Sequence, residues 1–357
     1  MSVQAWVDDR VPAQCRHFDA AAAGRVSRVV LAAEVAHLEA EAAVGAYVAE
    51  RSADPALAQG CAALGALVGL AGDDVFFTEG ASTAFTTLLD AWPLPPGARI
   101  GVVDSEFGSN ALALRRRAPL RGWELVELPA DALGRVTEVP AGLSLLCLPH
   151  VPSQRGIVQP TEDLIASGVP VLLDGAQAFG QVSVPVGAAA YVGTSRKWLC
   201  GPRGVGFGIV DPGWQAQLTA PPTLNGIEHA GMRRFDGADP HVAGRVGLSL
   251  AARSWSPALL PVVLAAAAAA RVLLDGAGGW RVVEPLEEPT GITTLRHASA
   301  DPEVTREALL AEGLLLSAVP VTRSDDLPGP VLRVSAPAWV TPADLEALAA
   351  ALERGSR

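Results

Sequence analysis

Two neighbouring stretches decide the fold: Val171-Leu-Leu-Asp-Gly-Ala-Gln177 and Tyr191-Val-Gly-Thr-Ser-Arg-Lys197. Each begins as a short apolar run and ends in polar residues, and 197 − 174 = 23 residues separate Asp174 from Lys197. Apolar runs of this kind are typical of strands buried on both faces of a mainly parallel sheet. Because ligands of open α/β sheets bind at strand ends, we expect both side chains at a ligand-binding edge.

Similar apolar runs recur along the first two thirds of the chain, with segments of helical length and composition between them, such as 82–92 and 109–117. This alternation predicts an α/β fold whose large domain has a central, mainly parallel seven-stranded sheet flanked by helices. The expected strands are 75–77, 100–103, 125–128, 143–148, 169–173, 191–192 and 205–210.

The pattern changes after the Ala- and Leu-rich helical segment 258–275. Strand-like and helical segments then alternate over a shorter length, which predicts a smaller C-terminal α+β domain. We assign residues 16–250 to the large domain, and residues 1–15 and 251–357 to the small domain. The Pro- and Gly-rich stretch 220–226 predicts a loop. The expected elements of the small domain are strands 280–283, 292–295 and 331–334 and helices 302–311 and 342–353.

The composition excludes several classes of protein. Of the 357 residues, 50% are hydrophobic and 18% are charged, which indicates a globular chain with a core. The net charge of -11 argues against a nucleic-acid partner, which would favour a basic excess. The longest apolar run, 258–270, is shorter than the about 20 residues that span a bilayer. With no secretory signal visible, we expect a cytoplasmic protein that has no membrane partner.

The four cysteines are scattered and include no C-x-x-C pair, and the histidines show no metal-ligand spacing. We therefore expect free thiols and no disulfide framework, zinc site or other metal site. The cysteines are Cys15, Cys61, Cys147 and Cys200.

One residue count stands out: of the 27 lysines and arginines, Lys197 is the single lysine. A compositional drift from lysine to arginine accounts for the bias itself. A lysine amine can form a Schiff base, however, whereas an arginine stays protonated and cannot. The retained lysine is therefore a candidate for covalent chemistry.

Asp174 and Lys197 together are the minimum equipment for binding pyridoxal 5'-phosphate (PLP). The aspartate can pair with a pyridinium nitrogen, and the lysine can form an imine. Alone, an aspartate at a strand end is more often a turn former or a helix cap. Residues 77–83 follow a strand and open a helix, so backbone N–H groups there can hold a phosphate. The same residues are also typical of an ordinary helix start.

These residues resemble the PLP enzymes of fold type I, in the class V aminotransferase and cysteine-desulfurase group. The resemblance runs from 17–24 to 331–335 and makes the large domain the PLP-binding one. It implies that Lys197 forms the Schiff base, that Asp174 pairs with the pyridine nitrogen, and that Gln177 donates to the phenolate oxygen. The residues that it assigns to the phosphate are Gly80, Ala81, Ser82, Thr194 and Arg196.

The resemblance assigns three further residues. Phe107 lies where the family stacks a ring, usually histidine, on the cofactor, and Ser153 lies where many members have an asparagine near cofactor and substrate. Arg333 matches the arginine that binds the substrate α-carboxylate, a bidentate task that suits its planar fork. Arg196 replaces a usual histidine, and Ala238 stands where many relatives have a threonine that reaches the neighbouring subunit's phosphate.

The C-terminal part narrows the subgroup. No cysteine follows Cys200, so the nucleophilic cysteine of cysteine desulfurases has no counterpart. Residues 44–50, 195–206, 279–284 and 288–295 instead resemble the C–S lyases of ergothioneine biosynthesis. This implies an amino-acid sulfoxide as substrate, hercynylcysteine sulfoxide, which β-elimination converts to ergothioneine through its sulfenic acid, with pyruvate and ammonia. Lys197 would then remove the Cα proton.

The resemblance also implies a homodimer with the active site at its interface. The substrate carries a trimethylammonium group, and because aromatic faces bind such cations, Phe18, Tyr47 and Trp339 are candidates. We assign Tyr47, with Arg333, to substrate binding, although ordinary packing is the commoner role of each aromatic. Two other functions stay open: a class V aminotransferase for a small amino acid and keto acid pair, and a catalytically dead scaffold.

Overall fold

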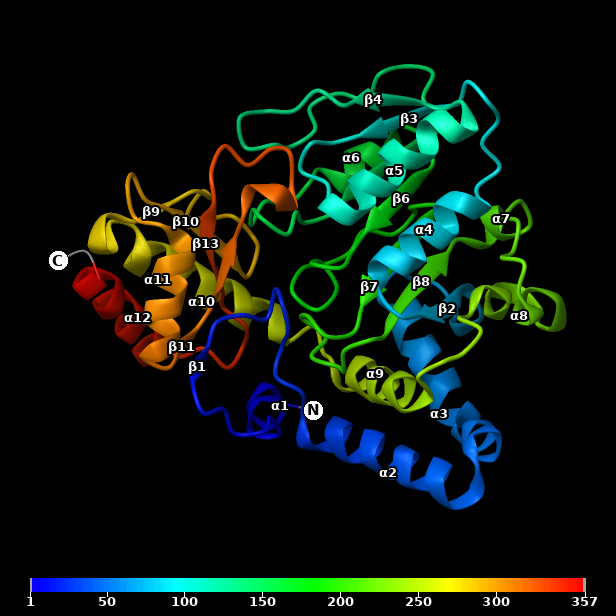
Figure 1. Ribbon diagram of the computed structural model, residues 1–357, viewed down its shortest axis with the longest axis horizontal. Coiled ribbons are helices and arrows are strands. Elements are labelled where there is room, and N and C mark those ends of the chain that lie inside the picture. The colour runs from blue at the N-terminus through cyan, green and yellow to red at the C-terminus, as the bar shows by residue number, and fades with distance from the viewer. Residues whose placement is uncertain (1, 356–357) are drawn as a thin grey trace.

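The predicted apolar runs form a single seven-stranded sheet in the computed structural model, which describes residues 2–355 (Figure 1). The strand order is β2-β8-β7-β6-β5-β3-β4, and every neighbouring pair is parallel except the two that involve β8. The prediction of a mainly parallel central sheet is confirmed. The strands are β2 (Val75–Thr78), β3 (Arg99–Val102), β4 (Glu124–Glu127), β5 (Leu145–Pro149), β6 (Val171–Asp174), β7 (Ala190–Thr194) and β8 (Gly206–Val210).

Helices cover both faces of this sheet because successive side chains of a strand point to opposite sides. Leu172 of β6 packs in the same apolar cluster as Phe85, whereas Leu173 packs in the cluster that contains Leu248. Both faces are thereby removed from water, as continuous apolar strands require. The helices are α4 (Ala81–Ala91) and α5 (Gly108–Arg121) on the first face, and α3 (Ala46–Ala66), α6 (Thr161–Ala166) and α9 (Val242–Ser254) on the second.

The C-terminal part forms a second, antiparallel sheet in the order β12-β13-β10-β9. Three helices pack against it around a core that includes Leu295, Leu309 and Leu348. This is the smaller α+β arrangement that the sequence predicts. Its elements are β9 (Arg281–Val282), β10 (Ile292–Arg296), β12 (Ser317–Val319), β13 (Val331–Ser335), α10 (Leu259–Leu274), α11 (Pro302–Ala311) and α12 (Pro342–Gly355).

The sequence does not predict three short strands, of which β12 is one. β1 (Arg16–His17) pairs in parallel with β11 (Leu314–Leu315), and two residues are too few to give a periodic signal. The expected loop 220–226 also differs, because α8 (Leu224–Glu228) begins inside it, where Thr223 caps the helix. The domain boundary at residue 250 falls within α9 and stays a prediction.

In Figure 1, α2 runs along the outer edge of the molecule. Within residues 2–355, no single helix is long and apolar enough to cross a membrane. The helices α9 and α10 reach that length and hydropathy only when taken together, and an 87° bend separates them.

The remaining elements are α1 (Val3–Asp8), α2 (Arg28–Val44), α7 (Pro212–Gln215), and the short 3-10 helices η1 (Gly72–Asp74), η2 (Gly231–Phe235), η3 (Ala277–Gly279) and η4 (Val321–Arg323).

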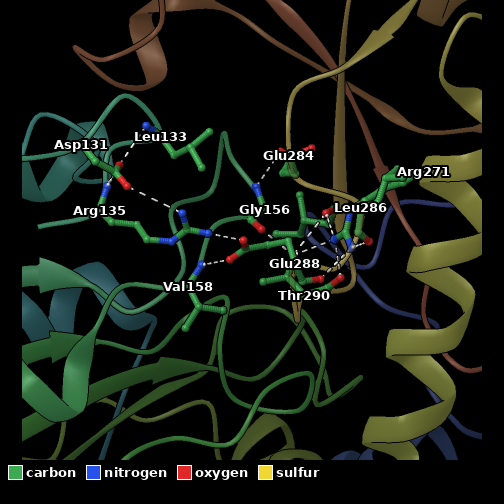
Figure 2. A network of polar contacts seen from close by, with 11 residues as sticks. Asp131, Leu133, Arg135, Gly156, Val158, Arg271, Glu284, Leu286, Glu288 and Thr290 are labelled. Carbon is green, nitrogen blue, oxygen red and sulfur yellow. Dashed lines mark hydrogen bonds and ion pairs between the residues drawn. The ribbon is translucent and has the colours of Figure 1, made fainter.

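A buried polar network fixes the loop that follows β5 against the C-terminal part (Figure 2). Glu284 accepts a hydrogen bond from the N–H of Gly156 at 2.8 Å, and Glu288 accepts one from the N–H of Val158 at 2.8 Å. Arg271 in turn donates to the carbonyl oxygen of Glu288 at 2.6 Å, which holds the segment that carries these carboxylates. The loop after β5 is therefore held by the segment 284–288 of the C-terminal part.

Candidate active site

A cavity of about 330 Å³ lies at the carboxyl ends of β6 and β7, with β12 as part of its wall. The structure brings together there the predicted catalytic lysine, every predicted cofactor residue and the predicted carboxylate-binding arginine. These residues are Gly80, Ala81, Ser82, Phe107, Ser153, Asp174, Gln177, Thr194, Arg196, Lys197 and Arg333.

Lys197 lies just after β7, and its side chain is buried in the cavity wall. Burial lowers the pKa of its amine to about 7; Asp174 opposes this shift, whereas nearby guanidinium groups, Arg196 among them, add to it. A large share of the amine is thus unprotonated near neutral pH, which is the nucleophilic form. Its Nζ lies 6.0 Å from the centroid of the Phe107 ring, which faces the same space.

Asp174 ends β6 and is held by two donors. Its Oδ1 accepts from the N–H of Ala176 at 2.8 Å, and its Oδ2 accepts from Nδ2 of Asn110 at 2.8 Å. Burial raises the pKa of this carboxyl, while Lys197 and the two donors oppose the rise. A cationic ring nitrogen beside the carboxylate would stabilise the ionised form in the same way as Lys197 does.

Sequence reasoning missed Asn110 and the residue behind it, Glu106. The amide of Asn110 also donates to Oε1 of Glu106 at 3.1 Å, and Oε2 of Glu106 has no partner among the described residues. Burial, reinforced by the charge of Asp174, raises the pKa of Glu106 to about 8. Their spacing of four residues around the start of α5 is the one signal that could have found the pair.

Gln177 is fixed by its neighbours in a defined orientation. Its Oε1 accepts from Nε1 of Trp198 at 3.0 Å, and its Nε2 donates to the carbonyl oxygen of Ala21 at 2.9 Å. An amide nitrogen has two hydrogens, so one N–H is left for a ligand in the cavity. This suits the predicted donor to a phenolate oxygen.

The start of α4 forms an anion cradle in the cavity wall. Among residues 2–355, no side chain caps the helix at Gly80, so the N–H groups of the first turn are free to bind a ligand. A Cβ on Gly206 of β8 would lie 2.4 Å from the carbonyl carbon of Gly80, so only glycine lets the strand approach this turn. Thr194 and Arg196 line the same cavity and supply a hydroxyl and a positive charge.

Arg333 is buried in β13 and is oriented by the loop after β5. Its Nη1 donates to the carbonyl oxygen of Ser153 at 2.8 Å, and its Nη2 lies 3.5 Å from Oδ1 of Asp19 and donates to Ser317 at 3.2 Å. Ser153 therefore contributes its backbone carbonyl to the site, since its hydroxyl donates to Gln154 at 3.3 Å.

The aromatic candidates lie outside the cavity. Tyr47 stands on α3 with 79% of its surface exposed, so its predicted role at the substrate is not met within one chain. Phe18 is fully buried in the small core, and Trp339 stacks on Trp6 with ring centroids 6.0 Å apart. For Phe18 and Trp339, the structure supports ordinary packing.

Cys200 packs behind the lysine turn and does not line the cavity. Burial raises the pKa of its thiol to about 11, so it stays protonated and unreactive at neutral pH. A Cβ on Gly24 would lie 2.6 Å from Sγ of Cys200, so the backbone at Gly24 packs tightly against this thiol. This agrees with a structural thiol.

The residues of the cavity fit PLP in their chemistry. Asp174 offers a carboxylate, Lys197 an amine that is partly unprotonated, and Phe107 a ring face. The uncapped start of α4 and Arg196 offer the donors and positive charge that a phosphate needs. Each polar part of the cofactor thus finds a complementary group in one cavity.

Comparisons with known proteins agree with this arrangement. The model of the class V aminotransferase family matches residues 16–324. A protein of Mycobacterium tuberculosis (strain CDC 1551 / Oshkosh) that is named probable hercynylcysteine sulfoxide lyase is 35% identical over 370 residues, which cover 97% of this chain and 92% of that protein.

Two solved structures share the fold. The apo cysteine desulfurase of Thermococcus onnurineus NA1 matches with a TM-score of 0.87 and 17% identity, covering 99% of this chain and 98% of that one. A variant of C-DES with glycine covalently linked to its PLP cofactor matches with a TM-score of 0.86 and 18% identity, covering 96% of this chain and 97% of that one.

Proposed function

The chain belongs to the class V aminotransferase family, and on that premise we propose that it cleaves hercynylcysteine sulfoxide by β-elimination. PLP is the cofactor of this family, and the enzyme is a carbon–sulfur lyase. The observation that carries the proposal is the buried Lys197 amine beside Asp174, in a cavity that no cysteine within residues 2–355 lines. The relative that is 35% identical and bears the name of that lyase supports the choice of substrate.

Five groups of this chain would hold the cofactor. Asp174 binds the ring nitrogen, the second N–H of Gln177 binds the ring oxygen, and Phe107 stacks on the ring face. The first turn of α4, with Arg196, binds the phosphate. When bound, PLP supplies an electron sink that stabilises negative charge on the substrate Cα.

The chain's own residues then bind the substrate and move one proton. Arg333 binds the α-carboxylate through its fork, which the carbonyl of Ser153 and the carboxylate of Asp19 orient. Lys197 accepts the Cα proton, because its pKa of about 7 leaves much of the amine free to act as a base. The C–S bond then breaks, and the sulfur group leaves with the bonding electron pair.

The products balance with one water molecule. The sulfoxide leaves as a sulfenic acid, and the three-carbon remainder is hydrolysed to pyruvate and ammonia. Conversion of the sulfenic acid to ergothioneine consumes two electrons, which we assign to two external thiols. The thiols are oxidised to a disulfide, and the sulfenic oxygen leaves as water. Cys200 does not supply these electrons, because its thiol is buried and outside the cavity.

The homodimer is part of the proposal. Leu31, Val35 and Leu38 follow one another at helical spacing on α2 and are 46%, 45% and 48% exposed. An exposed apolar stripe on the outer edge of the fold is typical of a surface that a second copy of the chain buries in a dimer. Tyr47 follows directly on α3, so any contact of this residue with substrate would have to cross the subunit boundary. Replacing Val35 with Glu should release monomers, seen as a halved mass in light scattering.

Product analysis tests the proposed function. The purified enzyme, incubated with hercynylcysteine sulfoxide and a thiol, should release pyruvate and ammonia in equal amounts, and Lys197→Arg should release neither. Formation of a new amino acid from an added keto acid, without pyruvate, would indicate the aminotransferase instead. Absence of both products would favour the scaffold.

A further inference from the structure

Arg323 is a cavity residue that the proposed mechanism does not use. It ends the short turn η4, directly after β12, and its side chain forms part of the cavity wall together with Ser317 and Val319. Its guanidinium makes no hydrogen bond or ion pair with any residue from 2 to 355. A guanidinium carries five donors, so this group has its full binding capacity free.

The backbone around Arg323 is nevertheless firmly held. Ser324 donates from Oγ to the carbonyl oxygen of Asp104 at 2.7 Å and accepts from Nε2 of Gln154 at 2.8 Å. Asp326 pairs with Arg155 at 2.7 Å. The neighbouring residues Ser324 and Asp326 are thus committed to structural contacts, while Arg323 presents a free charged group to the cavity.

The positive charge of Arg323 adds to that of the other cationic groups around the cavity, Arg196, Lys197 and Arg333. It contributes to lowering the pKa values of Lys197, Arg333 and Arg196, which line the same cavity. Each of those groups has a partner in the proposed mechanism: the cofactor, the α-carboxylate and the phosphate. The positive charge of Arg323 is then left without a partner, and a further anionic group of a ligand would offset it.

We propose that Arg323 binds a second carboxylate of the substrate, on the part that leaves with the sulfur. This rests on the proposed function. Hercynylcysteine sulfoxide has one carboxylate on its cysteinyl part and another on its hercynyl part, and Arg333 accounts for the first. A free guanidinium suits the second because two parallel N–H donors match two carboxylate oxygens. Arg323 therefore selects amino-acid sulfoxides whose leaving group is anionic.

A matched pair of substrates tests this inference in the holoenzyme. S-(2-carboxyethyl)-L-cysteine sulfoxide and S-propyl-L-cysteine sulfoxide have leaving groups of similar size and differ in the carboxylate. Arg323→Gln should lower kcat/KM for the carboxylated substrate roughly 10- to 100-fold more than for the propyl substrate, the difference expected of a charge-assisted pair. Arg203→Gln is the control, because it removes the same charge from an exposed arginine that does not line the cavity.

Two results would overturn the inference. An equal loss on both substrates would place Arg323 at the sulfoxide oxygen or the cysteinyl part, and a loss of bound PLP from the variant would place it at the cofactor. Binding is also measured by the change in cofactor absorbance as each compound is added. Should the wild type bind both compounds and release no pyruvate, the proposed function fails, and the ratio of the two dissociation constants in Arg323→Gln still tests the role of Arg323.

Discussion

Asn110 donates a hydrogen bond from Nδ2 to Oδ2 of Asp174 at 2.8 Å, and the same nitrogen donates to Glu106 at 3.1 Å. One amide thus holds two buried carboxyl groups side by side. Hydrogen bonding favours the ionised form of Asp174, whereas burial raises the pKa of Glu106 to about 8 and keeps it protonated near neutral pH. Glu106 therefore stands behind Asp174 without adding a second negative charge.

Removing this amide should weaken cofactor binding. Asn110→Ala leaves Oδ2 of Asp174 without a donor, at a cost of about 1–3 kcal/mol for a buried group. We expect the dissociation constant of PLP, measured by absorbance titration of the cofactor-free protein, to rise roughly 5- to 100-fold. Asn225→Ala is the control, since Asn225 also donates amide hydrogen bonds, which are partly buried, but lies outside the cavity. Equal affinities in the two variants would contradict this role.

Glu106 should make stability depend on pH. Its pKa is about 8 in the folded protein against an ordinary value of 4.5, so the folded state binds more protons between these limits and loses stability as the pH rises through them. Glu106→Gln removes this dependence. We expect the unfolding temperature of the cofactor-free wild type to fall more between pH 5.5 and pH 8 than that of the variant, by a few degrees. Glu39→Gln, on an exposed glutamate, should behave as the wild type does, and parallel curves for all three proteins would refute the prediction.

Uptake of the cofactor should follow the protonation of Lys197. Because its pKa is about 7 and the free amine is the attacking form, the rate at which PLP attaches to the cofactor-free protein should rise across pH 6–8 and level off above. Stopped-flow absorbance measures this rate. A rate that still rises steeply above pH 9 would show an ordinary lysine pKa.

The anion cradle should depend on Gly206. A Cβ there would meet the carbonyl carbon of Gly80 at 2.4 Å, so Gly206→Ala must displace the first turn of α4. We expect PLP affinity to fall at least 10-fold, with the phosphate-free cofactor analogue pyridoxal affected much less. Gly329→Ala should change neither, because nothing lies within 4 Å of a Cβ at that position. The same loss for PLP and pyridoxal would mean that the substitution disturbs more than the phosphate site.

The sequence predicts the sheet and the cavity well for one physical reason. Strands buried on both faces are continuous apolar runs, and their ends carry the polar residues that meet at the sheet edge. Asp174 and Lys197 are both such strand-end residues, and the resemblance supplied the roles of Gln177, Phe107 and Arg333. The two-residue strands β1 and β11 leave no such trace, because a period cannot be read from two positions.

The residues that sequence reasoning missed act through contacts between distant segments. Asn110 meets Asp174 across 64 positions, and Arg323 lines the same cavity as Lys197 from a turn next to the other sheet. Neither residue type is unusual in its local sequence, so only the folded arrangement reveals it. Tyr47 shows the opposite case: its sequence context matches a family segment, yet the single chain leaves it exposed.

The most direct test of the account is to reduce the yellow holoenzyme with borohydride and map the labelled peptide. The cofactor should be fixed to Lys197 alone, at one equivalent per chain, and Lys197→Arg should bind PLP without a reducible bond. A protein that remains colourless with added PLP, or a label found elsewhere, would contradict the central claim that this cavity is a PLP-dependent active site.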